Sequence, residues 1–493
     1  MVAFLAIAGA LTSCASAPGP NGPVRHGSTR GNAAPTPADA ASVAWDYEVT
    51  VDAALDLDVR ATFRGPMAGD LRVDDAATRF VQRLELEEGT SRVDRAPAAG
   101  DAPSWRAIGL DDRAHRAACA SRCTVRYHVR LRDAAKAVAD LDVAIMAGGA
   151  VFAPPSTWLV RPSEVPAGRY RFHVAAAPPM KFATGVRPAP GRADTYEAPA
   201  STLEDAAFAG FGALRLGHVA DPAIERATAP ELALTDDLVD AWLRAEASAI
   251  GSYIGRPPGG HAMLFVAPGT SPDTGGKTLG GGGASIFIRL GTKVTARNIL
   301  EDWVVAHELI HVAFPDVDRR YSWFSEGLAT YVEPIARAHE GLVTPEKVWA
   351  DMIEGLPQGM PGPRDGGLDG SQEWGRLYWG GALYFLLADV RIRERTSNAR
   401  GLQDAVRAVV ATGANIETMW PLSRIIEVGD RATGTTVMRE VYGELGPRRA
   451  QVDIEALFRR LGVRKEGGSV RFDDAAPLAG VRDAILPRQR PQR

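Results

Sequence analysis

The pentapeptide HELIH occupies residues 307–311, within the apolar segment Asn298 to Phe314, and it guides the interpretation of the whole chain. Positions i and i+4 share one face of a helix, so the imidazoles of His307 and His311 can reach a single metal ion. Glu308, beside the first histidine, has the chemistry of a general base for water activated by that metal. The pattern therefore predicts a helix that carries a metal site.

A candidate third ligand follows in the stretch WFSEGLATY, residues 323–331. Two histidines leave a catalytic zinc ion two ligands short, one from the protein and one from solvent. Fourteen residues separate His311 from Glu326, enough chain to turn and run a second helix back past the first. We expect that helix to begin with Ser322 as its N-cap. Glu326 would complete a His2Glu set of the thermolysin type.

HELIH followed by Trp-x-x-Glu-Gly-x-Ala resembles the gluzincin metallopeptidases, which share a zinc-binding helix pair. The resemblance implies that His307, His311 and Glu326 hold one Zn²⁺ ion. It also implies that Glu308 is the general base. The linker between the two motifs is shorter than in the alanyl aminopeptidases, a difference that surface loops accept.

A further match is YWGGAL at residues 378–383, which opens a predicted helix from Tyr384 to Arg393. It resembles the Tyr-x-x-Gly-Ala segment of gluzincin aminopeptidases and of the glycyl aminopeptidase-like family. The resemblance implies that Tyr378 donates a hydrogen bond to the oxyanion, a role that suits a phenol neutral at pH 7. The alternative is that Tyr378 is a packing residue.

The chain resembles the glycyl aminopeptidase-like family over its greatest length, roughly residues 45 to 465. Its order of β domain, helix, strand, glycine-rich segment and zinc helix is repeated here, and DIEALFRRLG at residues 453–462 looks like one of its closing helices. Two features differ. The Gly-x-Met-Glu-Asn segment of the alanyl enzymes has no counterpart, and we expect no PDZ domain of the kind that often ends the glycyl family.

The sequence GGGAS at residues 281–285 stands where Gly-x-Met-Glu-Asn would be. Glycines before an edge strand let another backbone approach closely, so we expect Gly281, Gly282 and Gly283 to contact a substrate. A plain flexible loop is the alternative. The run is not a phosphate-binding loop, because the Walker spacing is missing.

Apolar residues alternate with polar ones along several segments between Trp45 and Val174, which predicts strands. Helical periodicity from Thr235 to Ile254 is followed by short apolar runs at 262–266 and 284–290. We therefore predict an α+β fold, in which a β-rich domain at 44–217 precedes a thermolysin-like zinc peptidase domain. That domain would comprise a zinc-binding catalytic subdomain at 218–340 and a mainly helical C-terminal subdomain at 341–493.

The N-terminus resembles an export signal. The apolar run from Met1 to Leu11 is too short to span a bilayer and fits the core of a signal peptide at residues 1–13. Leu-Thr-Ser-Cys at 11–14 resembles a bacterial lipobox, which implies lipidation of Cys14. Residues 14–43, rich in Ala, Pro and Gly, would form the anchor and a flexible linker. An ordinary cleaved signal with an incidental cysteine is the alternative.

Cys119 and Cys123 are the other two cysteines, and no second cysteine pair completes a zinc set. In an oxidising compartment they can close a small disulfide loop. Two unpaired thiols are the alternative.

We expect a zinc metallopeptidase of the bacterial cell envelope, lipid-anchored to a membrane and facing the periplasm or exterior. Its substrate would be a peptide or protein; the net charge of −4 indicates no nucleic-acid partner. A non-catalytic metallopeptidase-like binding lipoprotein and a zinc hydrolase of a non-peptide substrate are the alternatives. The sequence leaves the oligomeric state open.

The expected specificity is aminopeptidase-like, with endopeptidase activity as the alternative. An aminopeptidase needs a carboxylate that binds the free ammonium group of its substrate. The glycine-rich strand offers none, and the sequence does not place Asp316, Asp318 or Glu333 in the cleft.

Overall fold

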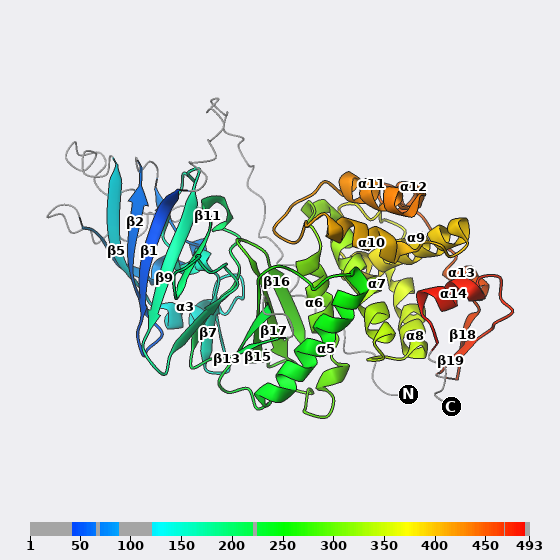
Figure 1. The fold of residues 1–493 in the computed structure, drawn as a ribbon, viewed down its shortest axis with the longest axis horizontal. Helices are drawn as coiled ribbons and strands as arrows, with labels where there is room; N and C mark the ends of the chain where they lie inside the picture. The colour runs from blue at the N-terminus through cyan, green and yellow to red at the C-terminus, as the bar shows by residue number, and fades with distance from the viewer. Residues whose placement is uncertain (1–41, 66–69, 88–120, 220–223, 468, 489–493) are drawn as a thin grey trace. The chain divides into compact units, whose positions relative to one another are not determined.

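The computed structural model describes residues 42–65, 70–87, 121–219, 224–467 and 469–488, which fall into two compact units (Figure 1). The first comprises the described residues up to Asp236 together with Gly260–Val294 and is rich in strands. The second comprises Asp237–Gly259 and the described residues from Thr295 onward and is mainly helical. The α+β class and the order of β-rich and helical parts are thus confirmed, whereas the domain boundaries at 44, 218 and 341 stay predictions.

A six-stranded sheet in the first unit contains the strands predicted from alternating hydrophobicity. On β1, Tyr47, Val49 and Val51 are buried while Glu48 and Thr50 are exposed. This alternation is what one buried face of a sheet requires. The strand order is β11-β9-β1-β2-β5-β4, and the bounds are β1 Val43–Val51, β2 Leu57–Arg64, β4 Val81–Leu86, β5 Arg122–Val129, β9 Arg169–Ala176 and β11 Thr195–Pro199.

Two further sheets of four and five strands belong to this unit, and aromatic contacts join them. Phe152 packs edge-on against Phe265 and Phe287, with ring centroids 5.6 and 4.7 Å away. Such edge-to-face pairs stabilise a core beyond the area that they bury. The sheets are β10-β12-β7-β6 (Lys181–Thr184, Ala209–Gly212, Ala150–Ala153, Ile145–Ala147) and β13-β14-β15-β17-β16 (Arg215–His218, Ile224–Thr228, Ala262–Pro268, Ala284–Leu290, Gly275–Leu279).

The second unit packs helices around α7, Ser322–His339. The predicted N-cap at Ser322 is wrong by one residue. The N-cap position is Tyr321, Ser322 is the first helical residue, and its Oγ donates to Arg319 O at 2.7 Å. Asp318 caps the preceding 3₁₀ turn instead, accepting from Arg320 N at 3.0 Å. The other helices are α5 Asp236–Ile254, α6 Val304–Ala313, α8 Pro345–Gly355, α9 Gly381–Thr396, α10 Leu402–Ala411, α11 Leu422–Thr433, α12 Val437–Leu445, α13 Ile454–Leu461 and α14 Ala479–Ile485.

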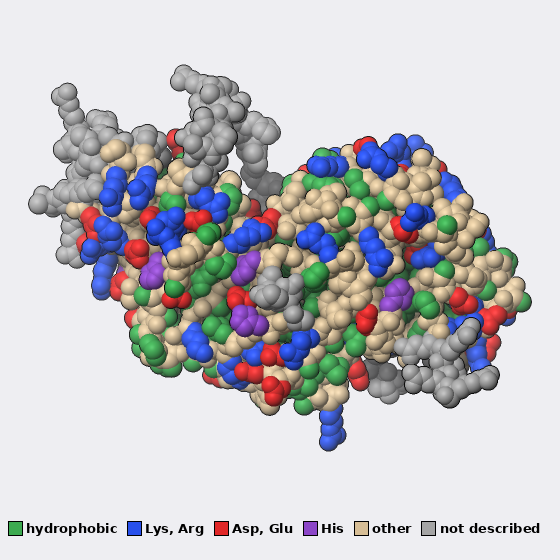
Figure 2. Space-filling view, in the orientation of Figure 1, with side chains coloured by type: hydrophobic (Ala, Val, Ile, Leu, Met, Phe, Trp, Pro, Cys, Tyr) green, Lys and Arg blue, Asp and Glu red, His purple; other side chains and the backbone are tan. Residues whose placement is uncertain are grey.

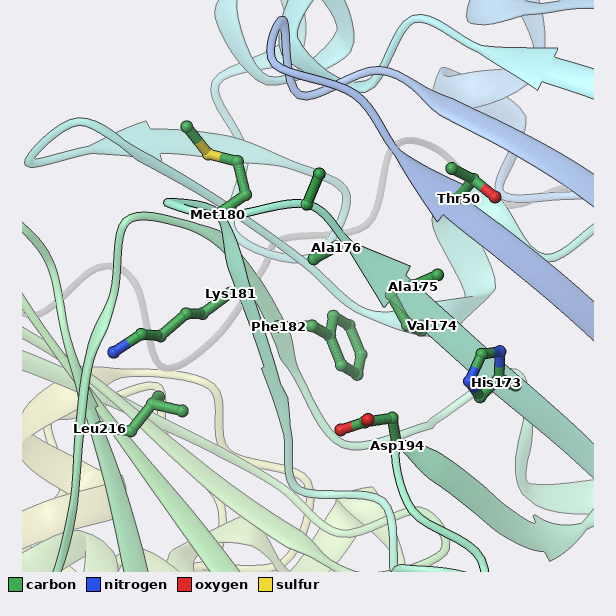
Figure 3. A pocket seen from close by; sticks show the side chains of 11 residues that line it. Thr50, His173, Val174, Ala175, Ala176, Met180, Lys181, Phe182, Asp194 and Leu216 are labelled. Atoms are coloured by element: carbon green, nitrogen blue, oxygen red, sulfur yellow. The ribbon is translucent and has the colours of Figure 1, made fainter.

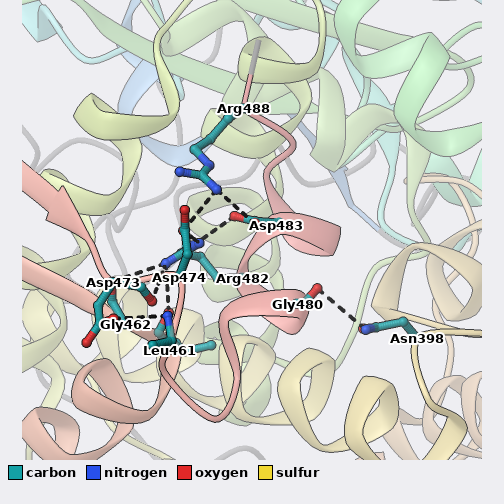
Figure 4. Close-up of polar contacts among 10 residues, drawn as sticks. Asn398, Leu461, Gly462, Asp473, Asp474, Gly480, Arg482, Asp483 and Arg488 are labelled. Carbon is teal, nitrogen blue, oxygen red and sulfur yellow. Dashed lines mark hydrogen bonds and ion pairs between the residues drawn. The ribbon is translucent and has the colours of Figure 1, made fainter. Parts of the chain in front are cut away.

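A buried arginine organises the C-terminal end of this unit (Figure 4). Arg482 on α14 is 1% exposed, and its Nη1 donates to the carbonyl oxygens of Gly462 and Asp473, both at 3.2 Å. Its other nitrogens pair with Asp474 and Asp483 at 2.6 and 2.8 Å. One guanidinium thus donates hydrogen bonds both to a carbonyl at the end of α13 and to a carbonyl in the turn before α14.

The face of the molecule drawn in Figure 2 carries charges of both signs. On the face drawn in Figure 2, Lys and Arg side chains are interspersed with Asp and Glu, as expected for an ordinary solvated surface. Among the described residues, no helix combines the length and the apolar character needed to cross a membrane.

The helical unit also buries two carboxylates beside one guanidinium. Glu246 on α5 is 0% exposed and lies 3.1 Å from Arg337 Nε, while Glu333 lies 3.1 Å from Arg337 Nη1. Burial raises the pKa of Glu246 to about 8 and that of Glu333 to about 7, although Arg337 opposes both shifts. Repulsion from Glu333 and Asp302 adds to the shift at Glu246.

This shift predicts a pH dependence of stability. A carboxyl whose pKa is raised by folding holds a proton that the unfolded chain releases, so the free energy of unfolding falls as the pH rises from about 5 to about 8, by up to about 1.4 kcal/mol per pH unit. Glu246→Gln removes this group, and we expect a flatter dependence in urea unfolding at pH 5.5, 6.5 and 7.5. Glu427→Gln, in an exposed pair with Arg431, is the control. An unchanged slope in Glu246→Gln would contradict the prediction.

Candidate metal centre

The predicted metal helix is α6, Val304–Ala313, whose N-cap position is Trp303. Asp302 Oδ1 accepts from Val304 N at 3.0 Å. His307 and His311 follow one turn apart, with their ring centroids 5.1 Å from each other. The HELIH segment is therefore helical, and both imidazoles lie on one face, as the spacing predicts.

Glu326, on α7, lies beside both histidines. Its Oε2 is 3.2 Å from His307 Nε2 and 3.6 Å from His311 Nε2, and one ligand atom from each residue lies within 4.8 Å of the others. Ligands about 2.0–2.1 Å from a tetrahedral zinc ion lie roughly 3.3 Å apart. The donor set and its spacing fit a zinc ion with three protein ligands and an open fourth position.

The electrostatics of this cluster match a cation-binding site. Burial opposes charge on both Glu326 and His311, but their mutual attraction outweighs it. As a result, the pKa of the Glu326 carboxyl is lowered, and the pKa of His311 is raised to about 9. Glu326 is thus held as an anion in a largely buried place, where a metal cation is its natural partner.

Glu308 lies in the same helical turn as His307 and is 2% exposed. A carboxylate removed from bulk water but beside a metal site can hold and release a proton at the reacting atoms. Its place on the ligand helix is the one that the HELIH motif predicts, and its role as base stays a prediction.

Tyr378 lies in a π-helical turn, Arg376–Gly380, directly before α9. Its ring is nearly parallel to that of His307, with a 5.8 Å centroid distance and a 17° interplanar angle. Trp374 stacks on Tyr378 at 5.3 Å and 23°. The structure thus brings Tyr378 to the metal cluster, where it also packs; π-turns often occur at functional sites because they redirect side chains.

Two glycines allow the helices that carry these residues to meet. A Cβ on Gly327 would lie 2.3 Å from Gly381 Cα, and a Cβ on Gly381 would lie 2.1 Å from Trp323 O. No side chain fits such gaps. The glycines of the Glu-Gly-x-Ala and Gly-Ala motifs therefore touch each other, which places Glu326 and Tyr378 on adjoining helices.

The predicted substrate glycines, Gly281, Gly282 and Gly283, belong to the strand-rich unit. Gly281 O accepts from Ala207 N, and Gly282 O accepts from Arg187 N, both at 3.0 Å. Added Cβ atoms would lie 2.2 Å from Asp205 O, 2.3 Å from Ala198 Cβ and 2.0 Å from Gly185 O, in that order. Close packing within the unit accounts for these glycines, and their contact with a substrate stays a prediction.

Sequence reasoning missed two aromatic residues at the site. Trp303, one residue before α6, is 37% exposed and lies 5.6 Å from the His307 ring. Trp374 contacts Tyr378 as described. Neither belongs to a recognisable motif; only their spacing of four residues from His307 and from Tyr378 could have drawn attention to them.

The three acidic residues considered for binding a substrate ammonium have distinct surroundings. Glu333 is buried and paired with Arg337. Asp318 caps the 3₁₀ turn before α7, and Asp316 pairs through its backbone with Thr418 and Trp420 beyond the end of α6. Glu333 is thus occupied within the core.

The predicted disulfide and lipidation residues are only partly described. Cys123, on β5, is 0% exposed and disulfide-bonded, which agrees with the expected bridge. Cys119 and Cys14 lie outside the described residues.

A cavity of about 520 Å³ in the strand-rich unit lies at the end of β9 (Figure 3). Its wall combines apolar groups with charged ones, among them Phe182, Lys181 and Asp194. None of the described residues predicted to bind metal or substrate lines it.

Comparison with known proteins adds to the fold. No protein-family model and no curated protein matches the chain. Among solved structures, the chain is similar to the crystal structure of an aminopeptidase N family protein from Idiomarina loihiensis. The TM-score is 0.62 at 14% sequence identity, and the match covers 85% of this chain and 78% of that chain. At this identity the likeness concerns the fold, so the chain has an aminopeptidase-like, peptidase-type fold.

Proposed function

We propose that this chain is a zinc-dependent metallopeptidase with a thermolysin-like, gluzincin-type site. The observation that carries the proposal is the convergence of His307, His311 and Glu326, with ligand atoms within 4.8 Å of one another, on two helices of a peptidase-type fold. Glu308 on the ligand helix and Tyr378 beside His307 supply the remaining groups that such chemistry needs.

His307, His311 and Glu326 would hold the ion, which when bound polarises the scissile carbonyl and lowers the pKa of water. Glu308 takes a proton from the attacking water and passes it to the leaving amine. Tyr378 donates its hydroxyl hydrogen to the oxygen that gains negative charge. The buried position of Glu308 limits competition from solvent for that proton.

The proposal places the enzyme in the bacterial cell envelope, anchored through a lipid on Cys14. The lipobox-like Leu-Thr-Ser-Cys at 11–14 supports an anchor, and the disulfide at Cys123 supports an oxidising compartment. The substrate would be a peptide or protein, cut from its N-terminus.

Zinc binding is the first prediction. Inductively coupled plasma mass spectrometry should find one zinc ion per chain. Free zinc at a concentration of 100 times its Kd should raise the free energy of unfolding of the metal-free protein by about 2.7 kcal/mol. His311→Ala should lose both the ion and the stabilisation. His128→Ala, which removes a histidine paired with Asp58, should keep both. Loss of zinc in His128→Ala but not in His311→Ala would contradict the assignment of the zinc ligands.

Catalysis by Glu308 is the second prediction. Glu308→Gln should retain zinc but lower kcat on a peptide library by about 10³-fold, because it removes the proton acceptor and keeps the side-chain volume. Glu301→Gln, at an exposed position just before α6, is the control. A zinc-loaded wild type that cleaves no peptide in a varied library would refute the proposed function.

Exopeptidase specificity is the third prediction. Acetylation of the N-terminus of a cleaved peptide removes the ammonium charge that an aminopeptidase must bind. We expect cleavage to be lost, as followed by mass spectrometry of the products. Cleavage of the acetylated peptide at an internal bond would instead identify an endopeptidase.

A further inference from the structure

The segment that precedes the metal helix is held by a side chain from α7. Arg337 Nη2 donates to Leu300 O at 3.1 Å and lies 3.4 Å from Asp302 O. Trp242 Nε1, on α5, donates to the same Asp302 carbonyl at 3.3 Å. Asp302 Oδ1 also accepts a hydrogen bond from Val304 N, the first residue of α6. Arg337 therefore contacts the residues that fix where α6 begins.

Arg337 is itself oriented by its two carboxylate partners. Glu246 holds Nε, and Glu333 holds Nη1, so Nη2 is directed at the carbonyl oxygens. Arg337 is 4% exposed as a residue, and its planar guanidinium contacts α5, α7 and the segment before α6. Lysine has a single ammonium group and cannot reproduce this geometry.

The same face of α7 carries the metal ligand. Glu326 and Arg337 are eleven residues apart, which is about three helical turns and about 16 Å along the axis. Glu326 contacts His307 and His311, whereas Arg337 contacts the chain just before α6. The two helices run in opposite directions, and α7 holds the α6 segment at two separated points.

We propose that Arg337 is a positioning residue, which fixes α6 against α7 and thereby sets the distance between the two histidines and Glu326. This inference rests on the proposed zinc site. Because three ligands must lie about 2 Å from one ion, a small shift of α6 along α7 weakens binding. Arg337 itself does not touch the reacting atoms.

The test measures zinc affinity by competition with a chromogenic chelator, and ligand geometry by the visible spectrum of the Co²⁺-substituted protein. Arg337→Met should weaken zinc binding about 10- to 100-fold, which is the range typical of mutations at residues that orient metal ligands without binding the metal. The Co²⁺ bands should shift in position or intensity. Arg337→Lys keeps the charge beside Glu246 and Glu333 but loses the fork, and should weaken zinc binding by an intermediate factor.

Arg393→Met is the matched control. Arg393 forms a largely buried pair with Asp389, four residues earlier on α9, with Nε 2.8 Å from Oδ1 and side chains 12% and 3% exposed. It should lower the melting temperature but leave the zinc Kd within about twofold of wild type, since additivity holds for sites without shared partners. A loss of affinity in Arg393→Met equal to that in Arg337→Met would overturn the inference.

The outcomes also separate this inference from the proposed function. If the wild-type protein binds no zinc, the proposed metallopeptidase function is refuted. Wild type that binds zinc, with folded Arg337→Met binding it equally well and showing the same Co²⁺ spectrum, refutes only the role of Arg337. If Arg337→Met does not fold, Arg337→Lys decides: wild-type affinity and an unchanged spectrum in that variant overturn the inference.

Discussion

The contact between Gly327 and Gly381 is the constraint on which the candidate site depends. A backbone approach that leaves 2.3 Å for a hypothetical Cβ lets α7 and α9 lie against each other without intervening side chains. Glu326 precedes one of these glycines, and Tyr378 lies three residues before the other. The metal ligand and the aromatic residue come together because the two helix backbones touch.

A second constraint concerns charge. The face of α7 that meets the metal cluster carries Glu326, Glu333 and Arg337, at spacings of seven and four residues. Glu326 is held as an anion by His311, while Glu333 and Glu246 share one guanidinium. Buried carboxylates need such partners, since an isolated charge in a protein interior is very costly. The helix that provides a metal ligand thus also provides the cation that balances neighbouring acids.

Much of this arrangement could be predicted from local patterns. Alternating hydrophobicity located β1, β5 and β9, and the spacing within HELIH placed two imidazoles on one helix face. The π-turn at Tyr378 has no sequence signal, because it depends on what packs around it. Glu246 did leave a trace: a charge within the apolar stripe of α5, between Leu243 and Ile250. Its partner, Arg337, is 91 residues away, a distance that no local pattern can bridge.

The glycines at 281–283 illustrate the opposite case. Their composition suggested a strand that a substrate backbone can approach, which stays a prediction, and in the structure residues 185–207 of the chain itself pack closely against them. A glycine run shows that some backbone comes close; it does not show whose backbone that is. Only the three-dimensional partners identify it.

The π-turn at Arg376–Gly380 has a consequence for how this chain can change over time. A π-turn holds one residue more than an α-turn, so it behaves as an insertion accommodated inside a helix. Loss of a single residue there would restore regular α-helix and rotate the preceding side chains by about 100° relative to α9. Tyr378 would then turn away from His307, whereas α9 itself, from Gly381 onward, keeps its sequence. Loss of one codon is therefore enough to move Tyr378 away from His307.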